Sequence, residues 1–108
     1  MADTVAGFFS ELEARVNPER AAGMNATYQF DITGDGGGKW HATFANGGVA
    51  VAEGKAETPN ITLTTDAATW MDIISGRTSG QTAFLLGKLK IQGDMSLAMK
   101  LASVFGLG

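Results

Sequence analysis

Residues 26–33 read ATYQFDIT, and the side chains of this stretch alternate strictly between apolar and polar. In an extended chain the alanine, tyrosine, phenylalanine and isoleucine share one face, while the threonines, glutamine and aspartate share the other. Such alternation is typical of a strand with one face buried and the other in contact with solvent. We therefore expect a half-buried β-sheet whose apolar face is covered by other elements.

Turn signals on both sides of further alternating stretches extend this sheet. A glycine-rich turn at residues 34–38 leads into a strand that contains Trp40, and Asn46-Gly47 is a strong hairpin signal. These signals predict a three-stranded meander followed by two further strands. The five predicted strands are residues 26–33, 40–44, 49–53, 61–65 and 88–92.

Apolar residues at helical spacing predict helices at both ends and in the middle of the chain. Each has a capping residue or a stop signal, such as Asp3 or Thr4 before the first, Asp66 before the central one and Asp94 before the last. The predicted helices are residues 4–16, 67–74, 81–86 and 95–105, with 18–25 either a short helix or an irregular linker. Because one face of the sheet is polar, the helices should cover only the other, which makes an α+β two-layer domain.

The helix predicted at residues 95–105 has too little polar surface for an ordinary solvent-facing helix. Lys100 is its only charged residue, and Ser96 and Ser103 are its only other polar residues. A surface helix usually keeps a broad polar face opposite one apolar stripe. Something apolar must cover a second side, and the candidates are more protein, a membrane surface or a bound lipid-like molecule. The simpler alternative is that these residues fill the core.

Length and composition narrow the class of protein. The chain of 108 residues is the size of one domain, 1–108, and it has no cysteine. Eight basic and eleven acidic residues give a net charge of −3, and the scattered basic residues form no face suited to nucleic acid. The N-terminus lacks the features of a secretory signal, and no stretch approaches the ~20 apolar residues that span a bilayer. We expect a soluble, cytoplasmic protein.

Few residues in the sequence could bind a metal or take part in catalysis. Asp31 opens a stretch similar to a calcium loop, but the twelfth position, which requires Glu, is Ala42. His41 is the only histidine, and no partner residues at metal-ligand or nucleophile spacing accompany it. We therefore expect no metal, no cofactor and no enzymatic activity.

One stretch resembles the signature of a known family. Residues 87–94, GKLKIQGD, followed by Leu97, Ala98 and Leu101, closely resemble the last strand and closing helix of the sterol carrier protein type 2 family. Three other stretches are similar to the same family in the same order: YQFDI at 28–32 with Trp40, ITLTTD at 61–66 before Trp70-Met71, and Gly76 before Phe84. The resemblance covers about residues 8–105.

The resemblance implies a fold and a function. The implied fold is a five-stranded, mostly antiparallel sheet with helices on one face and an elongated apolar cavity between the two layers. Members of the family bind sterols, fatty acyl chains, acyl-CoA or phospholipids without chemistry. This sequence lacks the peroxisomal C-terminal tripeptide of several eukaryotic members, which fits a stand-alone prokaryotic domain.

A carrier of this kind would bind a hydrophobic small molecule or lipid and make transient contact with membrane surfaces. We expect Gly87 and Gly93 to bracket the last strand, so that the terminal helices move as a lid. The residues predicted to line the cavity are Phe8, Leu12, Trp40, Trp70, Ile74, Phe84, Met95, Met99, Ala102 and Phe105.

Three alternatives stay open. The terminal helix could cover a partner protein or a second copy of the chain in a homodimer. The domain could be an accessory subunit of a lipid- or steroid-processing enzyme. It could also be a small enzyme that uses His41, Asp31, Asp35 and Asp72.

Overall fold

A computed structural model of the chain describes residues 4–16 and 18–105, apart from the side chains of residues 15, 18, 20 and 101–105. Its elements confirm the predicted α+β class. The predicted strands and the helices predicted at 4–16, 67–74, 81–86 and 95–105 lie within one or two residues of their expected bounds, and of the segment 18–25 only the first four residues are helical. In chain order they are α1 (Val5–Arg15), α2 (Pro18–Ala21), β1 (Ala26–Thr33), β2 (Gly38–Ala45), β3 (Gly48–Glu53), β4 (Ile61–Asp66), α3 (Ala67–Ile74), α4 (Gly80–Leu85), β5 (Leu89–Gly93) and α5 (Met95–Phe105).

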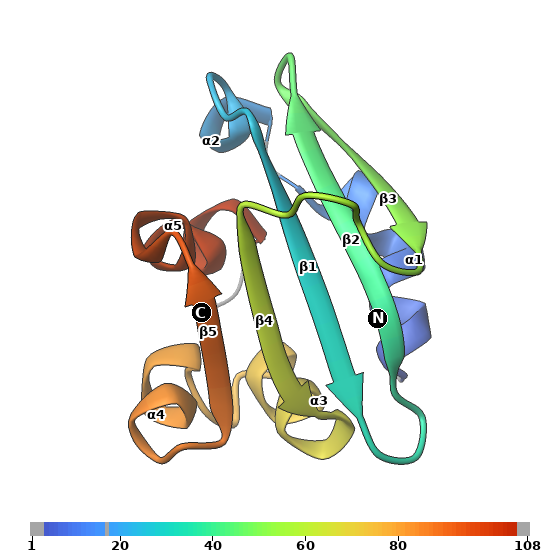
Figure 1. The fold of residues 1–108 in the computed structure, drawn as a ribbon, viewed down its shortest axis with the longest axis vertical. Coiled ribbons are helices and arrows are strands. Elements are labelled where there is room, and N and C mark those ends of the chain that lie inside the picture. The colour runs from blue at the N-terminus through green and yellow to red at the C-terminus, as the bar shows by residue number, and fades with distance from the viewer. Residues whose placement is uncertain (1–3, 17, 106–108) are drawn as a thin grey trace.

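The stretch ATYQFDIT forms β1, the central strand of the sheet. The strands lie in the order β3-β2-β1-β4-β5 (Figure 1). β1 pairs antiparallel with β2 and parallel with β4, whereas the β2–β3 and β4–β5 pairs are antiparallel. The sheet is thus mostly antiparallel, as expected, with one parallel pair at its centre.

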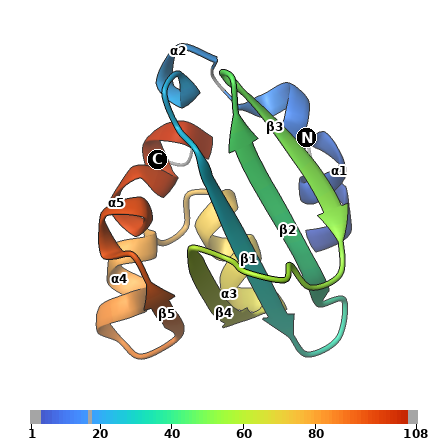
Figure 2. The ribbon, with the colours of Figure 1, turned by 45° about the horizontal axis from the view of Figure 1, so that its top comes forward.

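The helices lie on one face of this sheet (Figures 1 and 2). α1 covers β3 and its neighbour β2, α3 lies beneath β1 and β4, and α4 and α5 flank the edge strand β5. The inward side chains of β1 alternate as the sequence predicts, and Tyr28 and Phe30 are fully buried. Burying each such aromatic side chain contributes about 1.5–3 kcal/mol to stability, so β1 anchors the core.

Local signals set the ends of the elements. Thr4 caps α1, because its Oγ1 accepts a hydrogen bond from the Gly7 N–H at 2.9 Å. Asn46 and Gly47 have φ values of 55° and 80°, as a two-residue hairpin turn of type I′ requires. The predicted short helix at 81–86 instead begins at Gly80, because Ser79 caps it by accepting from the Thr82 N–H at 3.0 Å.

The connection from β3 to β4 crosses the polar face of the sheet (Figure 1). Because β3 and β4 lie on opposite sides of the β1–β2 pair, residues 54–60 must pass over these strands. Gln29 holds the connection: its Oε1 accepts from the Ala56 N–H at 2.7 Å, and its side chain is fully buried. His41 Nδ1 lies 3.1 Å from the Gly54 carbonyl oxygen. His41 therefore has a structural contact on the polar side, where the sequence places it.

Candidate functional site

Four of the predicted cavity residues lie in the packed core. Phe8, Leu12 and Trp70 have no exposed surface, and Trp40 is 7% exposed. Phe9, which the sequence analysis did not include, joins them: its ring stacks on Trp40 at 4.6 Å and on Trp70 at 5.8 Å between centroids. This aromatic cluster fills the space between α1, α3 and the sheet.

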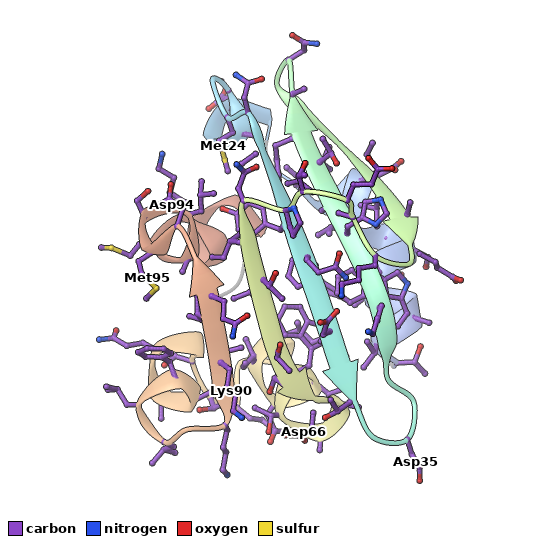
Figure 3. The ribbon with its side chains drawn as sticks, in the orientation of Figure 1. Met24, Asp35, Asp66, Lys90, Asp94 and Met95 are labelled. Atoms are coloured by element: carbon purple, nitrogen blue, oxygen red, sulfur yellow. The ribbon has the colours of Figure 1, made fainter. Side chains whose placement is uncertain are left out.

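A second group of predicted residues lies on the surface, on the helices that flank β5. Phe84 is 40% exposed, Met95 47% and Met99 83%, and the neighbouring Leu85 and Leu86 are 75% and 66% exposed. Met95 projects outward from the start of α5 (Figure 3). We call these five residues the β5-edge patch. Leu85 and Leu86 are not among the residues predicted to line the cavity, because a short apolar run gives no indication of which side faces the core.

Half-buried apolar side chains on α3, β5 and α5 pack against the core on the same side of the molecule as the β5-edge patch. Ile74, the remaining predicted residue with a described side chain, belongs to this group. Apolar side chains on this side therefore range from fully buried, as in Trp70, to 83% exposed, as in Met99. The other members that pack against the core from this side are Met71, Ile91, Leu97 and Ala98. Ala102 and Phe105 lie on α5, but their side chains are outside the described part of the structure.

Two polar groups point into this otherwise apolar interior. Trp70 Nε1 is buried and, within the described structure, has no hydrogen-bond acceptor. The Tyr28 hydroxyl donates to the carbonyl oxygen of Leu97 at 2.7 Å and so joins the central strand to α5. Burial, with a smaller contribution from the Asp94 carboxylate, raises the pKa of Tyr28 to about 12. The phenol is neutral and serves as a fixed donor.

The junction between β5 and α5 is held against the end of β4. Gly93 has a φ of 114°, and a Cβ at this position would overlap the Asn60 carbonyl oxygen. The same oxygen accepts from the Asp94 N–H at 3.1 Å. Asp94 Oδ1 also accepts from the Ser96 N–H at 2.9 Å, and hydrogen bonds from Ser96 lower the pKa of Asp94. Gly93 is thus needed for a close approach, while Gly87, with a φ of 76°, ends α4.

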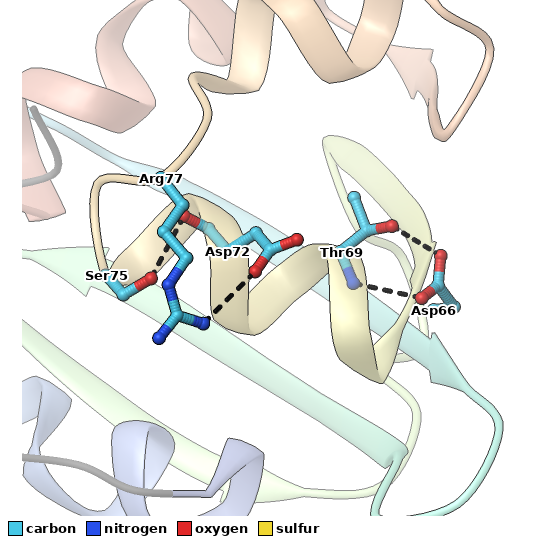
Figure 4. Close-up of polar contacts among 5 residues, drawn as sticks. All are labelled: Asp66, Thr69, Asp72, Ser75 and Arg77. Atoms are coloured by element: carbon cyan, nitrogen blue, oxygen red, sulfur yellow. Dashed lines mark hydrogen bonds and ion pairs between the residues drawn. The ribbon is translucent and has the colours of Figure 1, made fainter.

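The polar residues considered for catalysis are not gathered at one place. Asp31 and His41 lie on the face of the sheet away from the helices, and Asp35 lies in the β1–β2 turn (Figure 3). Asp72 lies on α3, where its carboxylate is 3.5 Å from the Arg77 guanidinium (Figure 4). The described side chains include no group of three or more His, Cys, Asp or Glu placed to hold a metal ion.

Within the described residues, no helix is both long and apolar enough to cross a membrane.

The chain is similar to known proteins along almost its whole length. It is 33% identical over 99 residues to hydroxysteroid dehydrogenase-like protein 2 of Xenopus tropicalis, an alignment that covers 91% of this chain and 24% of the relative. The chain thus spans about a quarter of the length of the curated relatives it matches first.

Solved structures share the fold. Palmitated sterol carrier protein 2-like protein 2 of Aedes aegypti superimposes with a TM-score of 0.78 at 25% identity, over 94% of each chain. The sec-alkylsulfatase Pisa1 of a Pseudomonas species contains a similar unit, with a TM-score of 0.77 at 25% identity, over 94% of this chain and 16% of the enzyme. The model of the SCP-2 sterol transfer family matches residues 9–106. Because this match covers more than half of the sequence, the chain belongs to the SCP-2 sterol transfer family.

Proposed function

We propose that this protein binds and carries an apolar ligand without catalysing a reaction of it. The ligand would lie between the sheet and the helices α3, α4 and α5. One observation carries the proposal: apolar side chains on this side of the molecule range from the buried Trp70 through half-buried residues to the exposed β5-edge patch. Exposed large apolar side chains that are concentrated on one part of a protein, here the helices that flank β5, favour a binding role. Transient contact with a membrane, where such a ligand is acquired and released, belongs to the same proposal.

A long acyl chain is the ligand class we favour. The structural neighbour from Aedes aegypti was solved in palmitated form, and its sequence is 25% identical to this chain. Burial of a chain of about sixteen methylene groups contributes roughly 12 kcal/mol, since each group contributes ~0.8 kcal/mol. The lost freedom of the ligand offsets several kcal/mol of this, so an affinity near micromolar is expected. Sterol-like, acyl-CoA and phospholipid ligands would bind through the same hydrophobic effect, because it is not directional.

We place the ligand with the predicted residues in two roles. The deep contacts come from the aromatic cluster, and the mouth lies at the β5 edge, where α4 and α5 flank the sheet. Methionines suit this mouth because their flexible, polarizable side chains adapt to irregular apolar shapes. The floor comprises Phe8, Leu12, Trp40, Trp70 and the half-buried Ile74, and the mouth comprises Phe84, Met95, Met99, Ala102 and Phe105. The buried Trp70 Nε1–H, which has no acceptor within the described structure, would donate a hydrogen bond to a ligand oxygen.

A single charge at the mouth tests this proposal. Met99 is 83% exposed, so Met99→Glu should leave the fold intact while it places a carboxylate against the acyl chain. We expect the affinity for a fluorescent fatty acid to fall by about tenfold or more, since a charge is excluded from apolar surroundings. The matched control is Ala52→Glu, an exposed position on the opposite edge strand β3. Equal affinities of the two variants, with unchanged circular dichroism, would refute the location of the site.

A second candidate function is that of an accessory domain in a lipid- or steroid-processing enzyme. The observation that favours it is that the matching region is only a part of two longer proteins. It covers 24% of hydroxysteroid dehydrogenase-like protein 2 and 16% of the alkylsulfatase. In this role the domain would hold a poorly soluble substrate near a catalytic partner. It predicts that adding this protein to a dehydrogenase raises the rate on a poorly soluble substrate but leaves the rate on a soluble one unchanged.

A further inference from the structure

The β5-edge patch extends beyond the proposed ligand site. Leu85 and Leu86, at the end of α4, are its members outside the proposed ligand site, and they are 75% and 66% exposed. They stand at the turn that joins α4 to β5, where the Lys88 N–H donates to the Ala83 carbonyl oxygen at 2.9 Å. Leucines at the tip of a helix are placed to enter an apolar phase without any change in the fold.

The patch is bordered by positive charge, in contrast to the rest of the molecule. Lys88 lies in the turn after α4, Lys90 on β5 (Figure 3) and Lys100 on α5, and all three are exposed. Within the described structure, none of the three forms an ion pair. Hydrogen bonds from Ser96 lower the pKa of Asp94 most, and the Lys100 ammonium lowers it further, so Asp94 offsets part of the Lys100 charge, while Asp72 pairs with Arg77.

Charge is unevenly distributed along the sequence. From Ala67 to the end there are four basic residues (Arg77, Lys88, Lys90 and Lys100) and two acidic ones (Asp72 and Asp94), which gives +2. Since the whole chain carries −3, residues 1–66 carry −5. Because of this unequal charge, an anionic surface attracts the part of the molecule formed by the second half of the chain and repels the part formed by residues 1–66.

We propose that the β5-edge patch, together with Lys88, Lys90 and Lys100, docks the protein on an anionic lipid bilayer. Exposed leucines beside lysines match the two attractions that hold peripheral proteins at a membrane, apolar insertion and attraction to anionic headgroups. Docking in this orientation places the mouth of the proposed ligand site against the lipid from which an acyl ligand would enter. In that sense the inference deepens the proposed function and rests on it.

Two other occupants of the patch are weaker matches. A second copy of this chain would bring the three lysines of one protomer close to those of the other if the two patches met face to face. Like charges at an interface disfavour association. A partner protein would need an acidic surface around an apolar centre, and nothing in the structure indicates one. An anionic bilayer supplies both features.

Vesicle co-sedimentation tests the proposal with matched pairs of variants. The vesicles contain phosphatidylcholine with about one-third phosphatidylserine, and pure phosphatidylcholine vesicles are the comparison. Lys88→Gln/Lys90→Gln changes the same charge as Lys39→Gln/Lys55→Gln, whose exposed lysines lie on β2 and the β3–β4 connection. We expect the first pair to lower partitioning by about fivefold per lysine, and the second pair to lower it by less than about twofold.

Apolar insertion is tested with Leu85→Ser/Leu86→Ser, which should abolish partitioning even to the anionic vesicles. Wild-type binding should also weaken as salt is added, because ions screen the lysines. The proposal is overturned if the wild type stays in the supernatant, or if the two lysine pairs behave alike. It is also overturned if sedimentation shows a dimer that Leu85→Ser/Leu86→Ser dissociates.

The same samples separate this inference from the carrier function. None of the lysines, nor Leu85 or Leu86, belongs to the proposed ligand site, so binding of a fluorescent fatty acid in solution should be unchanged in these variants. Loss of vesicle binding with intact fatty-acid binding supports the docking surface. If the wild type binds the fatty acid but does not bind vesicles, docking is overturned and only the ligand-binding part of the proposed function stands.

Discussion

Tyr28 links the most buried strand to the helix that flanks the β5-edge patch. Its ring packs in the core against Phe44 at 5.5 Å between centroids, while its hydroxyl reaches the Leu97 carbonyl oxygen. A side chain that is apolar at its base and polar at its tip can serve in both roles. The alternation in ATYQFDIT predicts that the ring is buried. It gives no information about the hydroxyl, because its acceptor lies 69 residues further along the chain.

Replacement of Tyr28 by Phe keeps the ring and removes this link. We expect Tyr28→Phe to lower the free energy of unfolding by about 1 kcal/mol, the usual contribution of one hydrogen bond. Denaturation in urea measures this change. If stability is unchanged while α5 keeps its position, the hydrogen bond does not hold the helix.

The same variant has a defined pH signature. Since the pKa of Tyr28 rises from 10.0 to about 12 on folding, its contribution is complete below pH 10 and is lost as the pH rises through about 12. The difference in stability between wild type and Tyr28→Phe should therefore shrink over this window. Tyr28 is the only tyrosine, so no other phenol contributes to the difference.

The helices α3 and α5 both begin at an aspartate that follows a strand. Asp66 Oδ2 accepts from the Thr69 N–H at 2.9 Å, and Asp66 Oδ1 accepts from the Thr69 hydroxyl at 2.6 Å (Figure 4). These hydrogen bonds lower the pKa of Asp66, with that from the hydroxyl contributing most. The negative charge also interacts favourably with the positive end of the helix dipole.

The Asp66 cap of α3 should make the stability of the protein depend on pH in the acid range. A carboxyl group whose pKa is lowered by folding stabilises the native state above its unfolded pKa, here 3.8, and loses this effect as the pH falls through the folded value. Asp66→Asn keeps an acceptor at the cap but has no charge to lose. We expect thermal melts of the variant to change less than those of the wild type between about pH 6 and about pH 3. Parallel curves for the two proteins would contradict an ionic role for the cap.

The elements were predictable because their signals are local. Alternation fixes β1, the Asn46-Gly47 pair fixes the β2–β3 hairpin, and Asp66 fixes the start of α3. The parallel β1–β4 pair was not predictable, because it depends on where the β3–β4 connection crosses the sheet. For the same reason Gln29 looks like any exposed strand residue in the sequence, although the connection buries it completely.

The interior as a whole has two unlike halves. Beneath β3 and β2, α1 buries Val5, Phe8, Phe9 and Leu12, each 2% exposed or less. Beneath β5, Ala83 is the only buried side chain of α4, and α5 has none among residues 95–100. The sequence identified the apolar residues of both halves but could not separate them, because packed cores and binding surfaces use the same side chains.

This asymmetry predicts where the molecule opens. Local opening has a low free energy where few apolar side chains are buried, so backbone amides of α5 should exchange with solvent faster than those of α1. A ligand that binds at the β5 edge stabilises the closed form by an amount that grows with its concentration over Kd. With palmitate at about 100 times its Kd, exchange in α4 and α5 should slow by up to about 100-fold, and exchange in α1 should change much less. Hydrogen exchange read by mass spectrometry measures both helices in one sample, and Met99→Glu, which weakens binding, should remove the effect. If palmitate slows exchange in α1 but leaves α4 and α5 unchanged, the mouth of the site does not lie at the β5 edge.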